Sequence, residues 1–156
     1  MTRVCLIGAE EVDLPVDLLA YETAREALSS YDVDEPFANS LAVETISLGA
    51  AVALLNDLQW YLVRLIESAF VLEPSVSGSE WLSRDLAEAI RDEEVDPPDS
   101  GEYLAIYGLE AREGGPPVLV EPMFARRVDG DHPAYDLRNV EETVVVRVTG
   151  SEFEAR

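Results

Sequence analysis

The sequence contains no lysine, and it has only one cysteine, Cys5, and one histidine, His132. One cysteine excludes an internal disulfide and any zinc cluster built on cysteines. One histidine excludes the zinc sites that need several imidazoles. Without lysine, the chain cannot form the phosphate-binding loop in which a lysine follows a glycine. The commonest metal and nucleotide motifs are therefore absent, and we expect neither a metal nor another cofactor.

Positive charge is scarce as well, because the 11 basic residues, all arginines, stand against 32 acidic ones and leave a net charge of −21. In dilute buffer such a charge destabilises a compact chain through self-repulsion. In molar salt the Debye length falls to about 3 Å, and the repulsion is largely screened. The acids are spread along the chain, so we interpret them as a solvated coat that attracts the cations of a high-salt solvent. The alternative is a nucleic-acid mimic or an acidic clamp for a basic partner, but arginines interrupt the acidic runs.

The sequence also lacks a basic stripe for phosphate contacts, so we expect no binding to nucleic acid. The N-terminus has none of the basic and apolar segments of a secretory signal. Residues 49–67 form the one stretch apolar enough to be considered for a membrane, and Asn56, Asp57 and Arg64 interrupt it. Charged residues at such positions are costly in lipid. We therefore expect a cytoplasmic protein that does not cross a membrane.

The apolar stretch Gly49–Glu67 reads GAAVALLNDLQWYLVRLIE. Apolar residues occupy most of its positions, so a helix formed here must be covered by other elements. It would be about 27 Å long, roughly the width of a small domain. We expect it to be the buried central helix of a single domain over residues 1–156, since this length is common for one domain.

Hydrophobic spacing predicts further elements on both sides of the central helix. Apolar runs predict strands at residues 3–8, 41–48, 69–72, 103–109, 117–128 and 143–149. Helical spacing predicts helices at 15–31 and 80–94, although 16–21 could instead be a strand with a helix from Glu22 onward. Pro122 should break or bulge its strand, which suits a sheet edge. The order of elements predicts an α+β (mixed α/β) fold, with strand–helix alternation in the first two-thirds and an antiparallel, strand-rich last third.

Six residues break the otherwise apolar surface of the central helix: Asn56, Asp57, Gln59, Trp60, Tyr61 and Arg64. The candidate binding residues among them are Asn56, Asp57, Trp60 and Arg64. They could form a patch where the helix reaches the surface, as an interface with Trp60 and Tyr61 as its anchors. They could instead satisfy the hydrogen bonds of loop backbone groups. The sequence leaves both alternatives open.

Two further places hold candidate binding residues. Arg126 and Arg127 are adjacent basic residues in an acidic chain, and they suit a small anionic ligand or an acidic partner surface. The alternative is internal pairing with nearby carboxylates. His132 is flanked by Asp129 and Asp131, and carboxylates can orient an imidazole as a base or help it bind a divalent ion weakly. The alternative for His132 is an ordinary acidic turn.

The segments RVCLIG, LNDLQWYLVR, EWLSRDLA and ETVVVRVT resemble those of an uncharacterised family of small acidic proteins from halophilic archaea. This resemblance covers most of the chain and implies a source, not an activity. Because catalytic motifs are missing, we expect a non-enzymatic interaction or regulatory module that forms a homodimer or binds a protein partner. The alternative is a small enzyme or ligand-binding domain that holds an anionic metabolite through carboxylates and Arg126 or Arg127.

Overall fold

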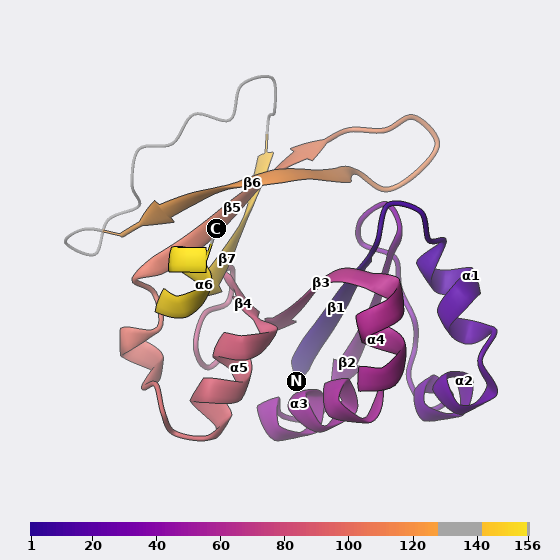
Figure 1. Ribbon diagram of the computed structural model, residues 1–156, viewed down its shortest axis with the longest axis horizontal. Coiled ribbons are helices and arrows are strands. Elements are labelled where there is room, and N and C mark those ends of the chain that lie inside the picture. The colour runs from indigo at the N-terminus through magenta and orange to yellow at the C-terminus, as the bar shows by residue number, and fades with distance from the viewer. Residues whose placement is uncertain (128–141, 156) are drawn as a thin grey trace.

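The computed structural model of the chain describes residues 1–127 and 142–155 (Figure 1). Within these residues, seven strands form one sheet in the order β2-β1-β3-β4-β7-β5-β6. Neighbouring strands are antiparallel except β4 and β7, which are parallel. The strands are β1 (Thr2–Gly8), β2 (Ser40–Thr45), β3 (Ile66–Leu72), β4 (Trp81–Ser83), β5 (Tyr103–Glu110), β6 (Val118–Arg126) and β7 (Glu142–Val148). The helices are α1 (Leu14–Leu19), α2 (Glu22–Leu28), α3 (Leu48–Asp57), α4 (Gln59–Leu65), α5 (Arg84–Arg91), α6 (Gly150–Ala155) and the 3-10 helix η1 (Pro97–Asp99).

This element order confirms the predicted α+β fold. Strands alternate with helices from β1 to α5, except that β4 follows β3 directly, and β5, β6 and β7 then form an antiparallel unit. The first strand is covered on both faces, because Val4 and Leu6 join one core while Cys5 and Ile7 join another. A strand buried on both faces needs apolar residues at successive positions. This explains why the RVCLIG segment shows no polar alternation.

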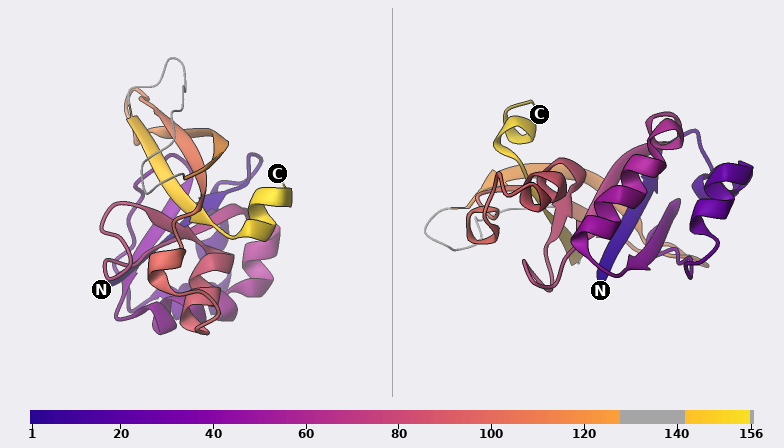
Figure 2. Two further views of the ribbon diagram at one scale, coloured as in Figure 1. Left: turned by 90° about the vertical axis from the view of Figure 1, so that its left-hand side faces the viewer. Right: turned by 90° about the horizontal axis from the view of Figure 1, so that it is seen from below.

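Helices cover one face of the β1–β3 region, with α3, α4 and α5 against the sheet and α1 and α2 beside them at the β2 end (Figures 1 and 2). The side chains between these helices and the sheet form the larger core, which we call the helix-side core. Its fully buried members include Leu14, Leu18, Leu28, Leu41, Leu55, Leu58, Leu62 and Leu82.

The predicted central helix is present as two consecutive helices, α3 and α4. Ser47 caps α3, since its Oγ accepts a hydrogen bond of 3.0 Å from the backbone N–H of Ala50. The helical run breaks at Leu58, whose backbone (φ −92°, ψ 1°) leaves the helical range. The last two residues of the predicted helix, Ile66 and Glu67, belong to β3 instead.

Burial of this helical segment is one-sided. Leu54, Leu58 and Leu62 face the helix-side core and are almost fully buried, as predicted. On the opposite side, Trp60 and Val63 are exposed to solvent. The sequence predicted that other elements would cover nearly every side of this segment. In the described part of the chain, the side that carries Trp60 and Val63 is not covered.

The helix predicted at 15–31 is also divided in two. α1 ends at Leu19 and α2 begins at Glu22, because Tyr21 between them has an extended backbone (φ −82°, ψ 124°). The alternative of a strand at 16–21 is wrong, whereas the helix start near Glu22 is confirmed.

The helix predicted at 80–94 is shorter than expected. Residues Trp81–Ser83 form β4, and α5 begins only at Arg84. Successive strand residues point to opposite faces, so Leu82 joins the helix-side core while Trp81 joins the core on the other face. Ser83 Oγ then caps α5 by accepting a hydrogen bond from Leu86 N (3.2 Å). The prediction that residues 81–83 belong to this helix is therefore wrong.

The sheet curls strongly around its second face, which we call the concave face. Three strand spacings separate β3 from β5, about 14 Å in a flat sheet. Even so, the rings of Phe70 on β3 and Tyr107 on β5 have centroids only 5.3 Å apart. The two ends of the strand order also meet, since Ala38 N, before β2, donates to Pro117 O, before β6 (2.8 Å). The concave core comprises Cys5, Ile7, Phe37, Ala42, Phe70, Trp81, Ala105, Val144, Val146 and Val148.

The strands predicted in the last third are confirmed as β5, β6 and β7. Among the described strands, β6 lies at the end of the sheet order, and its register with β5 shifts where Glu121 and Pro122 lie opposite Tyr107. Proline has no backbone N–H to donate, so it is tolerated at such an irregular edge. The predicted interruption at Pro122 is therefore confirmed as well.

Candidate functional site

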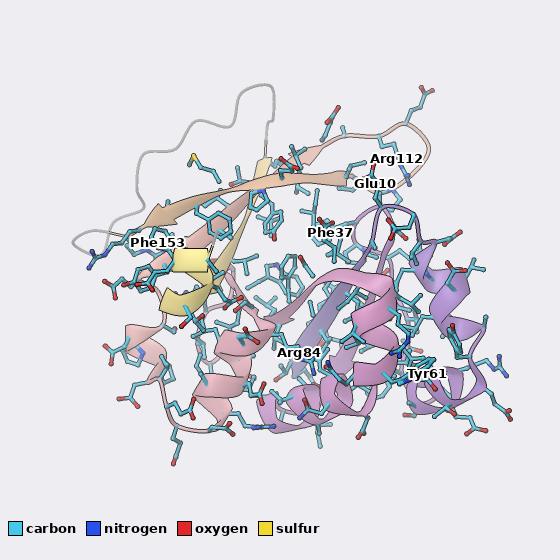
Figure 3. All side chains as sticks on the ribbon, in the orientation of Figure 1. Glu10, Phe37, Tyr61, Arg84, Arg112 and Phe153 are labelled. Carbon is cyan, nitrogen blue, oxygen red and sulfur yellow. The ribbon has the colours of Figure 1, made fainter. Side chains whose placement is uncertain are left out.

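Aromatic side chains gather where α4 packs beside α1 and α2. The ring centroids are 5.9 Å apart for Tyr21 and Trp60, 5.0 Å for Tyr21 and Tyr61, and 5.1 Å for Trp60 and Tyr61. Figure 3 shows Tyr61 in the space between α4 and the first two helices. The guanidinium of Arg64 lies 3.8 Å from the Trp60 ring centroid and donates to the Trp60 carbonyl oxygen. We call Tyr21, Trp60, Tyr61, Val63 and Arg64 the aromatic patch.

This aromatic patch is apolar and yet exposed. Trp60 is 53% exposed, Tyr21 41% and Val63 63%, whereas the other tryptophan, Trp81, is 8% exposed. Single exposed apolar residues are ordinary on a protein surface. A group of them indicates a surface for binding.

Asn56 and Asp57 precede the aromatic patch and have different surroundings. Asn56 Oδ1 accepts a hydrogen bond from Arg84 NH2 (3.1 Å), which also donates to Leu55 O (3.3 Å). Figure 3 shows Arg84 between α5 and the α3–α4 segment. Asn56 therefore links the end of α3 to the start of α5, which is a structural role. Asp57 is exposed and takes part in none of the ion pairs found among the described residues.

The two adjacent arginines at the end of β6 pair with different carboxylates. Arg126 donates to Glu102 Oε1 from Nε (3.0 Å) and from NH2 (2.5 Å), on the exposed surface. Arg127 NH2 donates to Glu80 Oε2 (2.6 Å). Arg147 Nε donates to the other oxygen of the same carboxylate, Oε1 (2.7 Å). Internal pairing, one of the two alternatives for Arg126 and Arg127, is therefore present at both positions.

Glu80 lies between two guanidinium groups and is only 7% exposed. Burial by itself raises the pKa of its carboxyl group. Hydrogen bonds from Arg147 and Arg127, together with their charges, outweigh the burial and lower the pKa below its ordinary value. The Nε of Arg127 is buried and has no acceptor in the described part of the chain.

A cleft of about 680 Å³ opens beside these guanidinium groups. Its lining includes Gly101, Arg127 and Arg147, together with the carboxylates of Asp99 and Glu102. A Cβ atom added at Gly101 would lie 2.8 Å from Arg127 NH1, so glycine lets the backbone approach the guanidinium closely. The cleft therefore exposes charges of both signs.

The structure thus separates the predicted site residues into two groups. Asn56, Asp57, Trp60 and Arg64 lie along α3 and α4, whereas Arg126 and Arg127 lie at the end of β6. His132 and its flanking acids lie outside the described residues.

Sequence reasoning missed Tyr21, Glu80 and Arg147 as neighbours of these residues. Tyr21 had no local signal except its position at the break between two helices. Glu80 is the first residue of the helix predicted at 80–94, and an exposed carboxylate is ordinary at such a position. Only the pairing of β4 with β7 brings Glu80 towards Arg147.

Within residues 1–127 and 142–155, no three residues among His, Cys, Asp and Glu are grouped so that they could hold a metal ion. In the same part of the chain, no helix combines the length and the apolar character that crossing a membrane requires.

Comparison with known proteins places the chain in a family without assigning an activity. No curated protein matches the chain, and no solved structure does. The match to a family model begins with β1, contains the aromatic patch and ends at residue 109 in β5, before β6. The prediction of an uncharacterised family is confirmed, while the halophilic archaeal source stays a prediction. Residues 2–109 match the model of a family of unknown function, DUF5804, and the chain belongs to that family.

Proposed function

We propose that this protein is a non-enzymatic interaction module that associates with a second copy of itself through the aromatic patch. The exposure of Trp60 beside Tyr21 and Val63 carries this proposal. Tryptophan, tyrosine and arginine are the residues most enriched at the centres of protein interfaces. Burying the exposed part of these side chains in a partner would remove apolar surface from water.

The aromatic patch is also ordered before any partner binds. Its three rings contact one another, and Arg64 stacks on Trp60. Side chains that are already held in place lose less conformational freedom on association. The contacts among the rings therefore favour a binding role for the aromatic patch. Residues that were exposed separately would not support such a role.

Charge favours a second copy as the occupant. Asp57 and Arg64 lie on opposite sides of Trp60 along the chain, and both are exposed. A two-fold axis near Trp60 would bring Asp57 of each copy towards Arg64 of the other copy, so that the interface contains two such pairs. The net charge of −21 opposes this contact in dilute buffer, whereas molar salt screens the repulsion. Self-association should therefore strengthen as the KCl concentration rises.

Sedimentation velocity in molar KCl tests this proposal. The wild-type chain should sediment as a dimer, and Trp60→Ser should sediment as a monomer that keeps the circular dichroism spectrum of the folded chain, with a lower melting temperature because association stabilises the folded state. Ile46→Ser is the matched control, because Ile46 is 82% exposed and lies outside the aromatic patch. This control should remain a dimer. A wild-type chain that stays monomeric at high protein concentration, or a dimer that survives Trp60→Ser, would refute the proposal.

The proposal also covers the solvent in which the protein works and the source of the protein. We infer that residues 1–156 fold as one domain in a high-salt cytoplasm, and that the source is a halophilic archaeon. The acid excess and the absence of lysine support this inference. No basic stripe is present in the sequence, which supports a protein partner over a nucleic acid.

A second candidate function is binding of a small anionic metabolite in the cleft beside Arg127 and Arg147. The presence of two guanidinium groups in the lining of one cleft favours it. Titration calorimetry with inorganic phosphate should show binding that is lost in Gly101→Ala, since the added methyl group would crowd Arg127 NH1. Arg126→Gln is the control, because Arg126 is absent from the lining and should leave binding unchanged.

A further inference from the structure

The concave face contains a cavity of about 400 Å³ that we call the concave cavity. It lies on the opposite face of the sheet from the helix-side core. Its lining includes small side chains on three strands, namely Ser68 on β3, Ser83 on β4 and Ala105 on β5. Larger residues at these positions would fill the space, as they do elsewhere in a close-packed core.

The shortness of β4 helps to explain why this space stays open. β3 pairs with β4 through only two residue pairs, Phe70 with Ser83 and Val71 with Leu82. The chain then leaves the sheet at Ser83 and begins α5. The first half of β3 and the end of β7 are therefore not bridged by β4, and the cavity lies between them.

Aromatic rings line the concave cavity. Phe70 and Tyr107 contact each other at 5.3 Å, and Phe124 contributes from β6. Phe153 of α6 packs on Phe124, with ring centroids 6.5 Å apart, and lies against the concave core. Burial raises the pKa of Tyr107, although a hydrogen bond with Ser68 opposes the shift, so the phenol stays neutral at ordinary pH. Ring faces carry negative electrostatic potential and attract cations.

Charged groups at the edge of the concave cavity are mainly acidic. The lining contains three carboxylates, those of Glu67, Asp85 and Glu152, and one guanidinium, that of Arg84. Arg84 uses NH2 to bind Leu55 O and Asn56 Oδ1 on α3, so its guanidinium is directed towards the helices.

Glu152 is fixed in place at this edge. Its Oε1 accepts hydrogen bonds from Ser83 Oγ (2.6 Å) and from Thr149 N (2.9 Å). A carboxylate held in this way provides a preorganised negative charge beside the aromatic rings. Among residues 1–127 and 142–155, neither bond uses Oε2, which leaves this oxygen for a further contact there.

We propose that the concave cavity binds a small organic cation with an apolar body, such as an alkyl- or arylammonium ion. The apolar body would contact Phe70, Phe124 and Val146, and the cationic group would lie between the ring of Tyr107 and the carboxylate of Glu152. Ligand sites commonly combine an apolar lining with a few fixed polar groups. Aromatic faces with a nearby carboxylate are suited to ammonium ions, whereas the excess of carboxylates repels anions.

This binding is independent of self-association, because the aromatic patch lies on the helices over the other face of the sheet. Benzyltrimethylammonium is a suitable probe, with phenylacetate as an anion of similar size. Binding can be followed by the emission of Trp81, whose ring lies 6.4 Å from that of Phe70. A Trp60→Phe background removes the only other tryptophan. In molar KCl the cation should change the emission saturably, and phenylacetate should not.

Two variants test the geometry. Glu152→Gln should weaken binding of benzyltrimethylammonium by about tenfold, as expected for one close ionic contact. Glu154→Gln is the matched control, because it removes the same charge from an exposed position of α6 outside the cavity lining. Ser68→Leu should abolish binding by filling the space.

The proposal is overturned if the probe does not bind, if phenylacetate binds as tightly, or if both glutamine variants weaken binding equally. Unchanged binding to a folded Ser68→Leu variant would also overturn it. If Ser68→Leu does not fold, the comparison of Glu152→Gln with Glu154→Gln still decides the question.

Discussion

Replacing Glu80 by glutamine should destabilise the fold far more than the same replacement of Glu102. Both carboxylates accept hydrogen bonds from arginines near the end of β6. Glu80 is 7% exposed and binds two arginines, whereas the Glu102 side chain is 44% exposed and binds one. The two substitutions remove the same charge and preserve the same shape, so they differ in burial and in the number of arginines that lose a partner.

The size of the expected loss in unfolding free energy follows from the surroundings of the arginines. The side chains of Arg127 and Arg147 are only 14% and 13% exposed, so water cannot replace the lost carboxylate charge fully. Breaking a buried ion pair from one side costs roughly 3–5 kcal/mol, and an exposed pair contributes roughly 0.2–1 kcal/mol. Because glutamine can still accept one hydrogen bond, we expect a loss of about 3 kcal/mol for Glu80→Gln and below about 1 kcal/mol for Glu102→Gln.

Urea unfolding followed by circular dichroism, at constant molar KCl, measures both losses by linear extrapolation. The lowered pKa of Glu80 adds a pH test. A carboxyl group whose pKa is lower in the folded state stabilises the fold above its unfolded pKa and loses this effect as the pH falls through the folded value. The difference between wild type and Glu80→Gln should therefore shrink as the pH falls below the ordinary value of 4.5. Equal losses for Glu80→Gln and Glu102→Gln would refute the assignment of Glu80 to a buried ion cluster.

Three further predictions concern the solvent, the thiol and the helix-side core. The melting temperature should rise steeply from low to molar KCl, because screening weakens the self-repulsion of a chain with net charge −21; a flat profile would contradict the high-salt interpretation. Cys5 is buried, and burial raises the pKa of its thiol to about 12, so a thiol reagent at about pH 8 should label it only as the protein unfolds. Labelling of the native protein at the rate of a small thiol would show that Cys5 is accessible. Leu55→Ala should lower the free energy of unfolding by roughly 2–5 kcal/mol in the urea assay, and a loss below about 1 kcal/mol would mean that Leu55 is not part of a close-packed core.

Elements with strong local signals were predicted well from the sequence. Residues 3–8 form a strand because a continuous apolar run with β-branched residues suits a strand that is buried on both faces. Pro122 lies at an irregular edge because its missing N–H rules out regular pairing. Predictions failed where the spacing of apolar residues fits both a helix and a strand. Trp81 and Leu82 suit the inner face of a helix, but pairing of Trp81 with Val146 and of Leu82 with Arg147 places them in a strand.

The candidate sites were predictable only in part. Trp60 and Arg64 stand out in the sequence because they interrupt an apolar segment, but the contribution of Tyr21 depends on a break between two helices. Arg127 stands out as a basic residue in an acidic chain, but its partner Glu80 is 47 residues away along the chain. The concave cavity has no sequence signal at all, since Ser68, Ser83 and Ala105 are small residues on three separate strands.

The sequence by itself determined the charge of the surface, the positions of most strands and the amphipathic or apolar character of each helix. These properties depend on residue type and on spacing within one segment. The tertiary structure alone decided that the sheet curls until Phe70 meets Tyr107, that Glu80 lies between two arginines, and that Trp60 stays exposed. Each of these outcomes depends on strand order and register, which arise from contacts between residues that are distant along the chain.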